Sequence, residues 1–247
     1  MGRKVEFLIA GVQKGGTSAL FDYLREVPGL QMPDVKEAHY FDDERVDWNA
    51  PDRTRYHELF VDDGRMWGEA TPIYLYWPNS LERIRAYHPG MRIILLFRDP
   101  VSRAFSHWQM EYAKGKETEP FDWCIRDGRA RVATGDPAAP GHHRVYSYVE
   151  RGFYGTQVAH LLDLFPREQV LFLRSSDLRR DPDAMIARIC RFLDVTPPAA
   201  ALTRREVRAA PRIAYPSTLT ISDRLLLARD YVAENARFTG LSGLSLD

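Results

Sequence analysis

The chain has 247 residues, of which 45% are hydrophobic and 28% charged, and its 34 basic residues balance 34 acidic ones. This composition is typical of a soluble globular protein and excludes disordered, collagen-like and low-complexity chains. The zero net charge argues against nucleic acid as a partner, because nucleic-acid-binding surfaces carry an excess of basic residues. The length fits one domain, which we expect to span residues 1–247.

Four short apolar segments predict buried parallel strands, at residues 6–12, 65–70, 91–97 and 169–173. Helical patterns alternate with these segments, at residues 17–27, 78–87, 100–114, 154–165, 182–193 and 222–234. Ser222 is the expected N-cap of the last helix. The alternation predicts an α/β fold in which helices flank a central parallel sheet. Ligands of such sheets bind at the carboxyl ends of the strands.

The cellular compartment is predicted from what the sequence lacks. The first apolar run is too short for a secretory signal peptide, and no stretch of about 18 apolar residues predicts a membrane span. The only cysteines, Cys124 and Cys190, lack the close spacing of a metal or redox motif. We therefore expect a cytoplasmic protein that has no membrane partner.

A glycine-rich loop joins the first predicted strand to the first predicted helix. The loop consists of Gln13, Lys14, Gly15, Gly16, Thr17 and Ser18. Backbone N–H groups of such a loop, at a helix N-terminus, form an anion site. Gly11, Gly16 and Ser18 have the spacing of a P-loop, but Thr17 occupies the position of the P-loop lysine, and Lys14 lies three residues earlier. The loop alone is also compatible with a plain glycine turn.

A second polar segment follows the strand predicted at residues 91–97. Arg98 lies at the end of this strand, and Ser106 lies about two turns into the next helix. An arginine and a hydroxyl group can together bind a phosphate. Arg98 precedes Asp99, so this strand end suits an anion better than the Mg²⁺ of a nucleotide kinase. The alternative is a capped helix start with an arginine in a surface ion pair.

In this order and on these elements, the two segments resemble those of sulfotransferases. The similarity is greatest to the branch that contains heparan sulfate sulfotransferase domains and many bacterial enzymes. It implies a three-layer sandwich like that of P-loop kinases, no metal, and 3′-phosphoadenosine 5′-phosphosulfate (PAPS) as donor. The glycine-rich loop would hold the 5′-phosphosulfate, while Arg98 and Ser106 would hold the 3′-phosphate. Lys14 would stabilise charge on the bridging oxygen.

The same resemblance points to a catalytic base in the segment Lys36-Glu37-Ala38-His39-Tyr40-Phe41-Asp42. It implies that Glu37 removes the acceptor proton, a task that a carboxylate performs better if partial burial raises its pKa. His39 is the rival base, because imidazole titrates near neutral pH. From the residues alone, the segment is also compatible with a polar turn whose aromatic side chains pack inward.

Three further positions are interpreted through the resemblance. A lysine that glycosaminoglycan enzymes carry is replaced by Ala70, which favours a small molecule, such as a natural product, or a saccharide as acceptor. Tyr154 either lines the nucleotide site or packs in the core. Arg212 either contacts the 3′-phosphate or belongs to a solvated basic face.

Two other functions remain open at this point: a P-loop kinase that needs ATP and Mg²⁺, and a non-catalytic nucleotide-binding module. Transfer to an amine in place of a hydroxyl group is also open, as is the oligomeric state.

Overall fold

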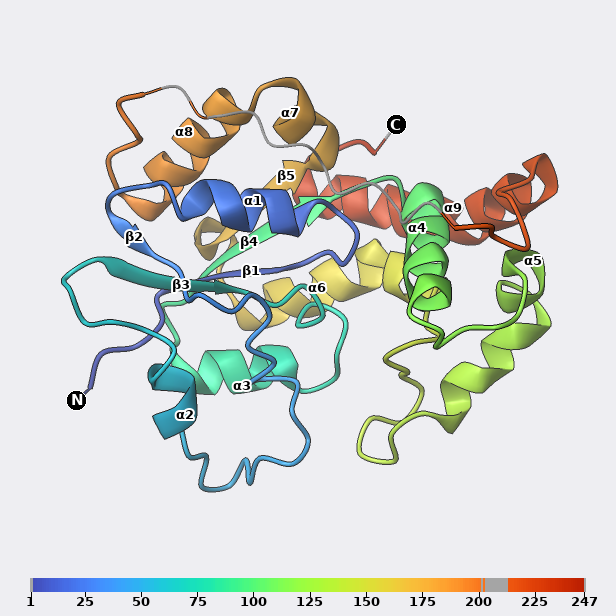
Figure 1. The fold of residues 1–247 in the computed structure, drawn as a ribbon, viewed down its shortest axis with the longest axis horizontal. Helices are drawn as coiled ribbons and strands as arrows, with labels where there is room; N and C mark the ends of the chain where they lie inside the picture. Colours follow the sequence, from blue (N-terminus) through green and yellow to red (C-terminus); the bar gives the residue numbers. More distant parts are fainter. Residues whose placement is uncertain (1, 201, 203–212, 247) are drawn as a thin grey trace.

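A parallel five-stranded sheet forms the centre of the molecule (Figure 1). The computed structural model describes residues 2–200, 202 and 213–246. Across the sheet the strands have the order β2-β3-β1-β4-β5. They are β1 (Phe7–Gly11), β2 (Leu30–Gln31), β3 (Met66–Ala70), β4 (Arg92–Phe97) and β5 (Val170–Arg174). The parallel sheet that the alternating pattern predicted is therefore confirmed.

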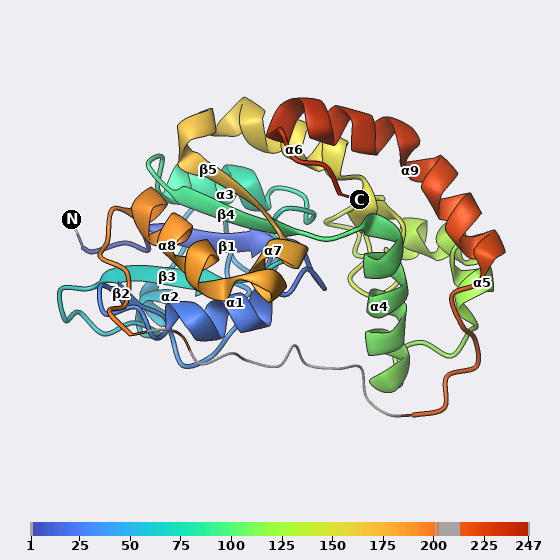
Figure 2. The same cartoon turned by 90° about the horizontal axis from the view of Figure 1, so that it is seen from above.

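Helices cover both faces of the sheet (Figure 2). On one face lie α1 (Thr17–Leu24), α7 (Ser175–Arg180) and α8 (Pro182–Leu193). On the other lie α3 (Ser80–Tyr87) and α6 (Tyr154–Leu164), and α9 (Ile221–Ser242) packs along α6. The remaining elements are α2 (Thr54–His57), α4 (Pro100–Ala113), α5 (Phe121–Cys124), η1 (Asp127–Thr134), η2 (Glu150–Gly152) and η3 (Arg167–Gln169).

Alternate residues of the strands point into two separate cores. In β1, Phe7 and Ile9 pack with the helices α1 and α8, whereas Leu8 and Ala10 pack with α3 and α6. Both sets are fully buried, because each face of a parallel sheet is covered. This burial explains why the strands read as continuous apolar runs and not as alternating ones.

A third core lies beyond the carboxyl end of the sheet and supports α4. There Trp108 of α4 packs with Phe121, Tyr148, Leu227 and Tyr231, which come from α5, the segment before η2, and α9. In Figure 1, α4 stands beside the end of β4, from which it continues the chain. This packing fixes the helix that carries the second predicted polar segment.

The differences from the sequence prediction are confined to short elements and helix ends. The last helix begins one residue earlier than expected, and Thr220 caps it in place of Ser222. The Thr220 side chain accepts from the Asp223 N–H, and the Asp223 carboxylate accepts from the Thr220 N–H, so the two residues form a capping box. Strand β2 was not predicted, because a two-residue strand has no readable pattern.

Among the residues that the structure describes, no helix combines the length and the apolar character needed to cross a bilayer.

Candidate active site

The glycine-rich loop is held tightly against the end of β4. Gly15 donates its N–H to the Val12 carbonyl over 2.9 Å, and a Cβ atom at Gly15 would lie 2.2 Å from the Leu96 carbonyl oxygen. A side chain therefore has no room at this position. Gly16 has a φ of 101° and precedes the first residue of α1, a conformation that favours glycine. The N–H groups of the loop therefore lie at the N-terminus of α1.

A cavity of about 370 Å³ lies over this loop and brings the two predicted polar segments together. From the predicted set it is lined by Gln13, Lys14, Gly16, Thr17, Ser18, Arg98 and Ser106. We call it the donor pocket, after the ligand that the sequence motifs predict for it. Gly15 lies behind the lining, where it packs on β4. Arg212 lies outside the described residues.

The charges that line the donor pocket favour the binding of an anion. Burial lowers the pKa of Lys14, and the neighbouring cations Lys114 and Arg98 lower it further. Burial also lowers the pKa of Arg98, with Arg179 as the next contributor. Within the described part of the chain, no carboxylate forms an ion pair with Lys14. Cations that are crowded together in this way are stabilised by a bound anion.

Tyr154 supports the donor pocket from behind. Its side chain is fully buried, and its ring packs 4.9 Å from the ring of Phe97 and 5.8 Å from that of Phe238, between ring centroids. Its hydroxyl group donates to the Arg98 carbonyl over 3.1 Å. Tyr154 is therefore a core residue that holds the backbone of Arg98, and it is not part of the pocket lining.

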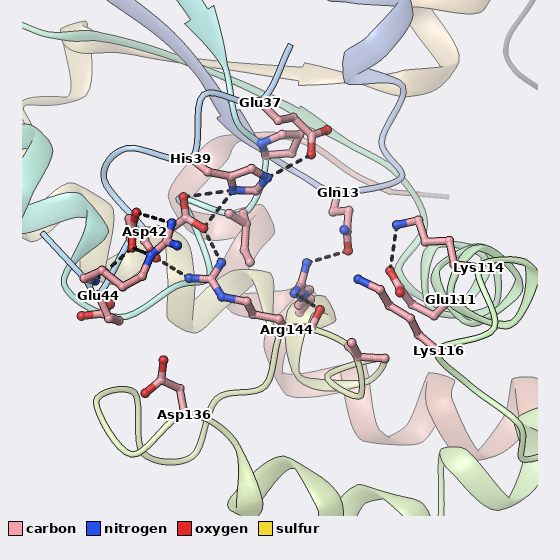
Figure 3. A pocket seen from close by; sticks show the side chains of 16 residues that line it. Gln13, Glu37, His39, Asp42, Glu44, Glu111, Lys114, Lys116, Asp136 and Arg144 are labelled. Atoms are coloured by element: carbon pink, nitrogen blue, oxygen red, sulfur yellow. Dashed lines mark hydrogen bonds and ion pairs between the residues drawn. The ribbon is translucent and has the colours of Figure 1, made fainter. Parts of the chain in front are cut away.

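A second cavity of about 470 Å³ adjoins the donor pocket (Figure 3). We call it the acceptor cleft. The two cavities share Gln13, Glu37, Pro72 and Lys114. The acceptor cleft also contains His39 and Asp42, which come from the predicted base segment. A molecule in the cleft therefore meets the donor pocket at Glu37.

The backbone of the base segment is strained at the two candidate bases. Glu37 and His39 have φ values of 67° and 52°. The Glu37 N–H donates to the Ala70 carbonyl over 3.0 Å, and the His39 N–H donates to Thr71 Oγ1 over 3.4 Å. Left-handed backbone at a non-glycine residue costs on the order of 1–3 kcal/mol and concentrates at functional sites. Lys14 adopts it too, with a φ of 68°.

Glu37 and His39 form a charged pair, in which the pKa of Glu37 is lowered and not raised. Burial alone raises the pKa of Glu37, but hydrogen bonds with His39 and Lys36 outweigh burial and hold the pKa at about 2. Hydrogen bonds to Asp42 and Glu37 raise the pKa of His39 to about 9. Near neutral pH the site therefore holds a carboxylate beside an imidazolium.

The carboxyl group whose pKa is raised is Glu69, which lies behind the base segment. Its side chain is fully buried, and burial raises its pKa to about 7, although hydrogen bonds with Thr71 and Tyr74 oppose the rise. Thr71 Oγ1 donates to Glu69 Oε2 over 2.7 Å. The same Thr71 hydroxyl oxygen accepts from the His39 N–H. Glu69 therefore supports the segment and does not face either cavity.

Three functional candidates were missed in the sequence: Lys114, Arg144 and Arg151. Lys114 lines both cavities, while Arg144 and Arg151 line the acceptor cleft. Lysine is scarce in the sequence, and this scarcity could have pointed to Lys114. Only five of the 34 basic residues are lysines, and four of these line one or both cavities. The arginines had no such signal, because arginine is abundant throughout the chain.

Within residues 2–200, 202 and 213–246, no group of three or more His, Cys, Asp or Glu side chains is placed to hold a metal ion.

The fold and the paired cavities define a class of protein: a group transferase with the architecture of P-loop kinases, in which a cationic pocket at the strand ends meets a cleft with an acid–base pair. Residues 4–208 match the family model of the sulfotransferase domain. The chain belongs to the sulfotransferase family.

Curated relatives come from the same branch that the sequence motifs indicated. Human heparan sulfate glucosamine 3-O-sulfotransferase 6 is 31% identical over 192 residues, which cover 75% of this chain and 51% of the relative. Human heparan sulfate glucosamine 3-O-sulfotransferase 3B1 is 29% identical over 191 residues, with 75% and 45% covered. The chain thus spans about half the length of these relatives.

Solved structures confirm the fold. A sulfotransferase from Alicyclobacillus acidocaldarius superposes with a TM-score of 0.79 at 28% identity, covering 99% of this chain and 98% of that one. The sulfotransferase domain of the Synechococcus PCC 7002 olefin synthase has a TM-score of 0.55 at 14% identity, with 92% and 94% covered, and shares the fold.

Proposed function

We propose that this protein transfers a sulfuryl group from PAPS to a hydroxyl group, or an amine, of a small-molecule or saccharide acceptor. The observation that carries the proposal is the junction of two cavities at Glu37: one is lined by cations and helix N-terminal N–H groups, and the other by an acid–base pair. The donor supplies the sulfuryl group and leaves as 3′-phosphoadenosine 5′-phosphate (PAP).

The donor pocket supports the binding half of this proposal. The loop N–H groups, with the hydroxyls of Thr17 and Ser18, would hold the 5′-phosphosulfate. Arg98 and Ser106, which line the same pocket, would hold the 3′-phosphate. Lys14 would stabilise the negative charge that develops on the bridging oxygen when the sulfur–oxygen bond breaks.

The base segment supports the chemical half. As the acceptor oxygen bonds to sulfur, its proton must leave, and the Glu37 carboxylate at the junction would receive it. His39 Nε2 lies 3.5 Å from Glu37 Oε2 and would keep that carboxylate ionised, so that it is free to accept a proton near neutral pH, although its low pKa makes it a weak base. In-line displacement requires the acceptor to enter opposite the leaving PAP, which the placement of the two cavities allows.

The charges of the acceptor cleft favour an acceptor that is not a polyanion. Among described residues, its lining contains six carboxylates and five Lys or Arg side chains, besides His39. Several of the cations already pair with cleft carboxylates, as Arg45 does with Asp43 and Lys114 with Glu111. A cleft for a polyanion requires a surplus of cations. The relatives named for heparan sulfate glucosamine therefore do not by themselves indicate the acceptor of this chain.

The test is transfer of labelled sulfate from PAPS in the presence of EDTA, with metabolite and saccharide fractions sorted by charge as acceptors. We expect labelled products from fractions of neutral compounds, together with micromolar PAP binding by calorimetry. A requirement for ATP and Mg²⁺ would establish a kinase instead. PAP binding without transfer to any fraction would indicate a non-catalytic nucleotide-binding module.

A further inference from the structure

Five side chains of alternating charge form a continuous row, which begins at Lys36 in the donor pocket and continues along the wall of the acceptor cleft through Glu37, His39, Asp42 and Arg144 (Figure 3). Lys36 pairs with Glu37, whose Oε2 lies 3.5 Å from His39 Nε2. His39 Nδ1 lies 3.0 Å from Asp42 Oδ2, and Arg144 Nη1 donates to the same Asp42 oxygen. Four of the five belong to one short segment, and Arg144 is the only distant member, 102 residues beyond Asp42.

Arg144 makes three contacts besides its ion pair with the Asp42 carboxylate. Its guanidinium lies over the ring of Trp77, with 4.0 Å between Cζ and the ring centroid, and its Nη2 donates to the Asp42 carbonyl. Its own carbonyl accepts from Arg151 Nη2 over 2.8 Å. The Trp77 ring and the Arg151 guanidinium thus hold Arg144 from two sides, and both hydrogen bonds of the Arg144 guanidinium go to Asp42.

Asp42 needs both of its cationic partners. Its side chain has no exposed area, and an unpaired carboxylate in such a place is costly. Hydrogen bonds from His39 and Arg144 offset burial and lower its pKa. Because the two cations share one carboxylate, Arg144 reduces the amount by which Asp42 raises the pKa of His39.

We propose that Arg144 is a positioning residue, which fixes Asp42 and thereby orients His39 against Glu37. The proposal rests on the proposed function of Glu37 and His39, and it assigns to the segment between η1 and η2 a part in assembling the acid–base pair. Arg144 acts through Asp42 and does not itself need to touch the reacting atoms.

The proposal has a measurable electrostatic consequence at His39. The charged groups that act on this imidazole are Glu37, Asp42, Lys36, Arg144 and, from β3, Glu69. Removing the Arg144 charge leaves Asp42 to act on His39 alone, so the imidazolium is stabilised. The midpoint of the His39 titration should then rise, and the geometry of the pair with Glu37 should loosen.

The experiment follows the His39 imidazole by NMR during pH titration of the full chain saturated with PAP. The chain has seven histidines, so the signal is assigned with His39→Gln. In Arg144→Gln we expect the midpoint to move up by roughly half a pH unit or more. In Arg144→Lys, which keeps the charge, the midpoint should stay close to that of the wild type. Arg45→Gln is the matched control, because Arg45 lines the same cleft and pairs with Asp43, outside the row.

An unchanged His39 midpoint in folded Arg144→Gln would overturn the proposal, as would equal shifts in Arg144→Gln and Arg45→Gln. If Arg144→Gln does not fold, the decision rests on Arg144→Lys and Asp42→Asn. A His39 midpoint that moves as far from the wild-type value in Arg144→Lys as it does in Asp42→Asn would contradict a role of the Arg144 charge. A midpoint in Arg144→Lys close to that of the wild type would support it. Failure of the wild type to bind PAP would contradict the proposed function, and the same His39 titration is then carried out on the chain without PAP, where the expected shifts are the same.

Discussion

Arg151 donates from Nη1 to Oε1 of Gln13 over 2.6 Å, and so ties the wall of the acceptor cleft to the donor loop. The Arg151 side chain is buried, and its other hydrogen bonds go to Ser147 Oγ and to the Arg144 carbonyl, which are neutral. Burial lowers its pKa to about 10. One buried guanidinium thus contacts both the loop that would hold the donor and the residue that positions the acid–base pair.

Replacing Lys14 should abolish most of the activity while leaving the fold intact. Lys14→Ala removes the cation at the bridging oxygen, and the loss of one such group typically costs about 10²–10³-fold in rate. The measurement is labelled sulfate transfer alongside thermal unfolding. Lys4→Ala serves as control, because Lys4 donates to the Tyr87 carbonyl, away from both cavities. Equal losses of activity and thermal stability in Lys14→Ala would contradict a catalytic role.

Arg98→Met should weaken PAP binding by about 10- to 100-fold, because a charge-assisted contact to a phosphate is lost. Calorimetric titration with PAP measures the effect, which should shrink as salt is raised. Arg167→Met provides the comparison, since Arg167 is exposed and precedes β5, at the opposite end of the sheet. Unchanged PAP affinity in Arg98→Met would show that the 3′-phosphate binds elsewhere.

Glu37→Gln should lower the rate of transfer by roughly 100-fold or more, since an amide cannot accept the acceptor proton. PAP affinity should change little, because the donor contacts remain. The matched control is Glu58→Gln, an exposed residue just after α2. Retention of wild-type rates by Glu37→Gln would contradict the assignment of Glu37 as the base.

The His39 pairing should make stability depend on pH in a defined direction. The pKa of His39 is raised to about 9 in the folded state, from an ordinary value of 6.5. Its contribution to the free energy of unfolding is therefore fully present below about pH 6.5, and is lost as the pH rises through 9. Urea unfolding of the wild type and His39→Gln at several pH values measures this. The stability difference between them should shrink from pH 6.5 to pH 9.5, and a constant difference would contradict the pairing.

Gly15→Ala should destroy donor binding, because the new Cβ atom would meet the Leu96 carbonyl oxygen at 2.2 Å and force the loop away from β4. PAP titration should show no binding, with a loss of stability of about 1–3 kcal/mol. Gly240→Ala is the control, since a Cβ atom there meets no other atom within 4 Å and lies inside α9. We expect Gly240→Ala to bind PAP normally, with stability equal to or slightly above that of the wild type. Normal PAP binding by Gly15→Ala would contradict the close approach.

The parts that could be predicted from sequence are those whose signals are local. The apolar runs predicted β1, β3, β4 and β5, and the loop at Lys14 and the pair Arg98 and Ser106 follow directly from strand ends. Arg144 and Arg151 could not be found, because only the folded chain brings them to residues more than 100 positions away. The direction of the Glu37 pKa shift could not be predicted either, because it depends on the hydrogen bonds that the folded segment gives to the Glu37 side chain.

The contact between Gly15 and β4 has a consequence for the choice of donor. The loop rests on the Leu96 carbonyl, and Arg98 leaves the same strand two residues later, with its Nη1 3.5 Å from the Lys14 carbonyl. The position of Arg98 relative to the loop is therefore set by β4. Under the proposed function, the strand end would select a nucleotide by the spacing between its 5′ and 3′ charged groups, and a nucleotide without the 3′-phosphate would leave the Arg98 charge without an anion.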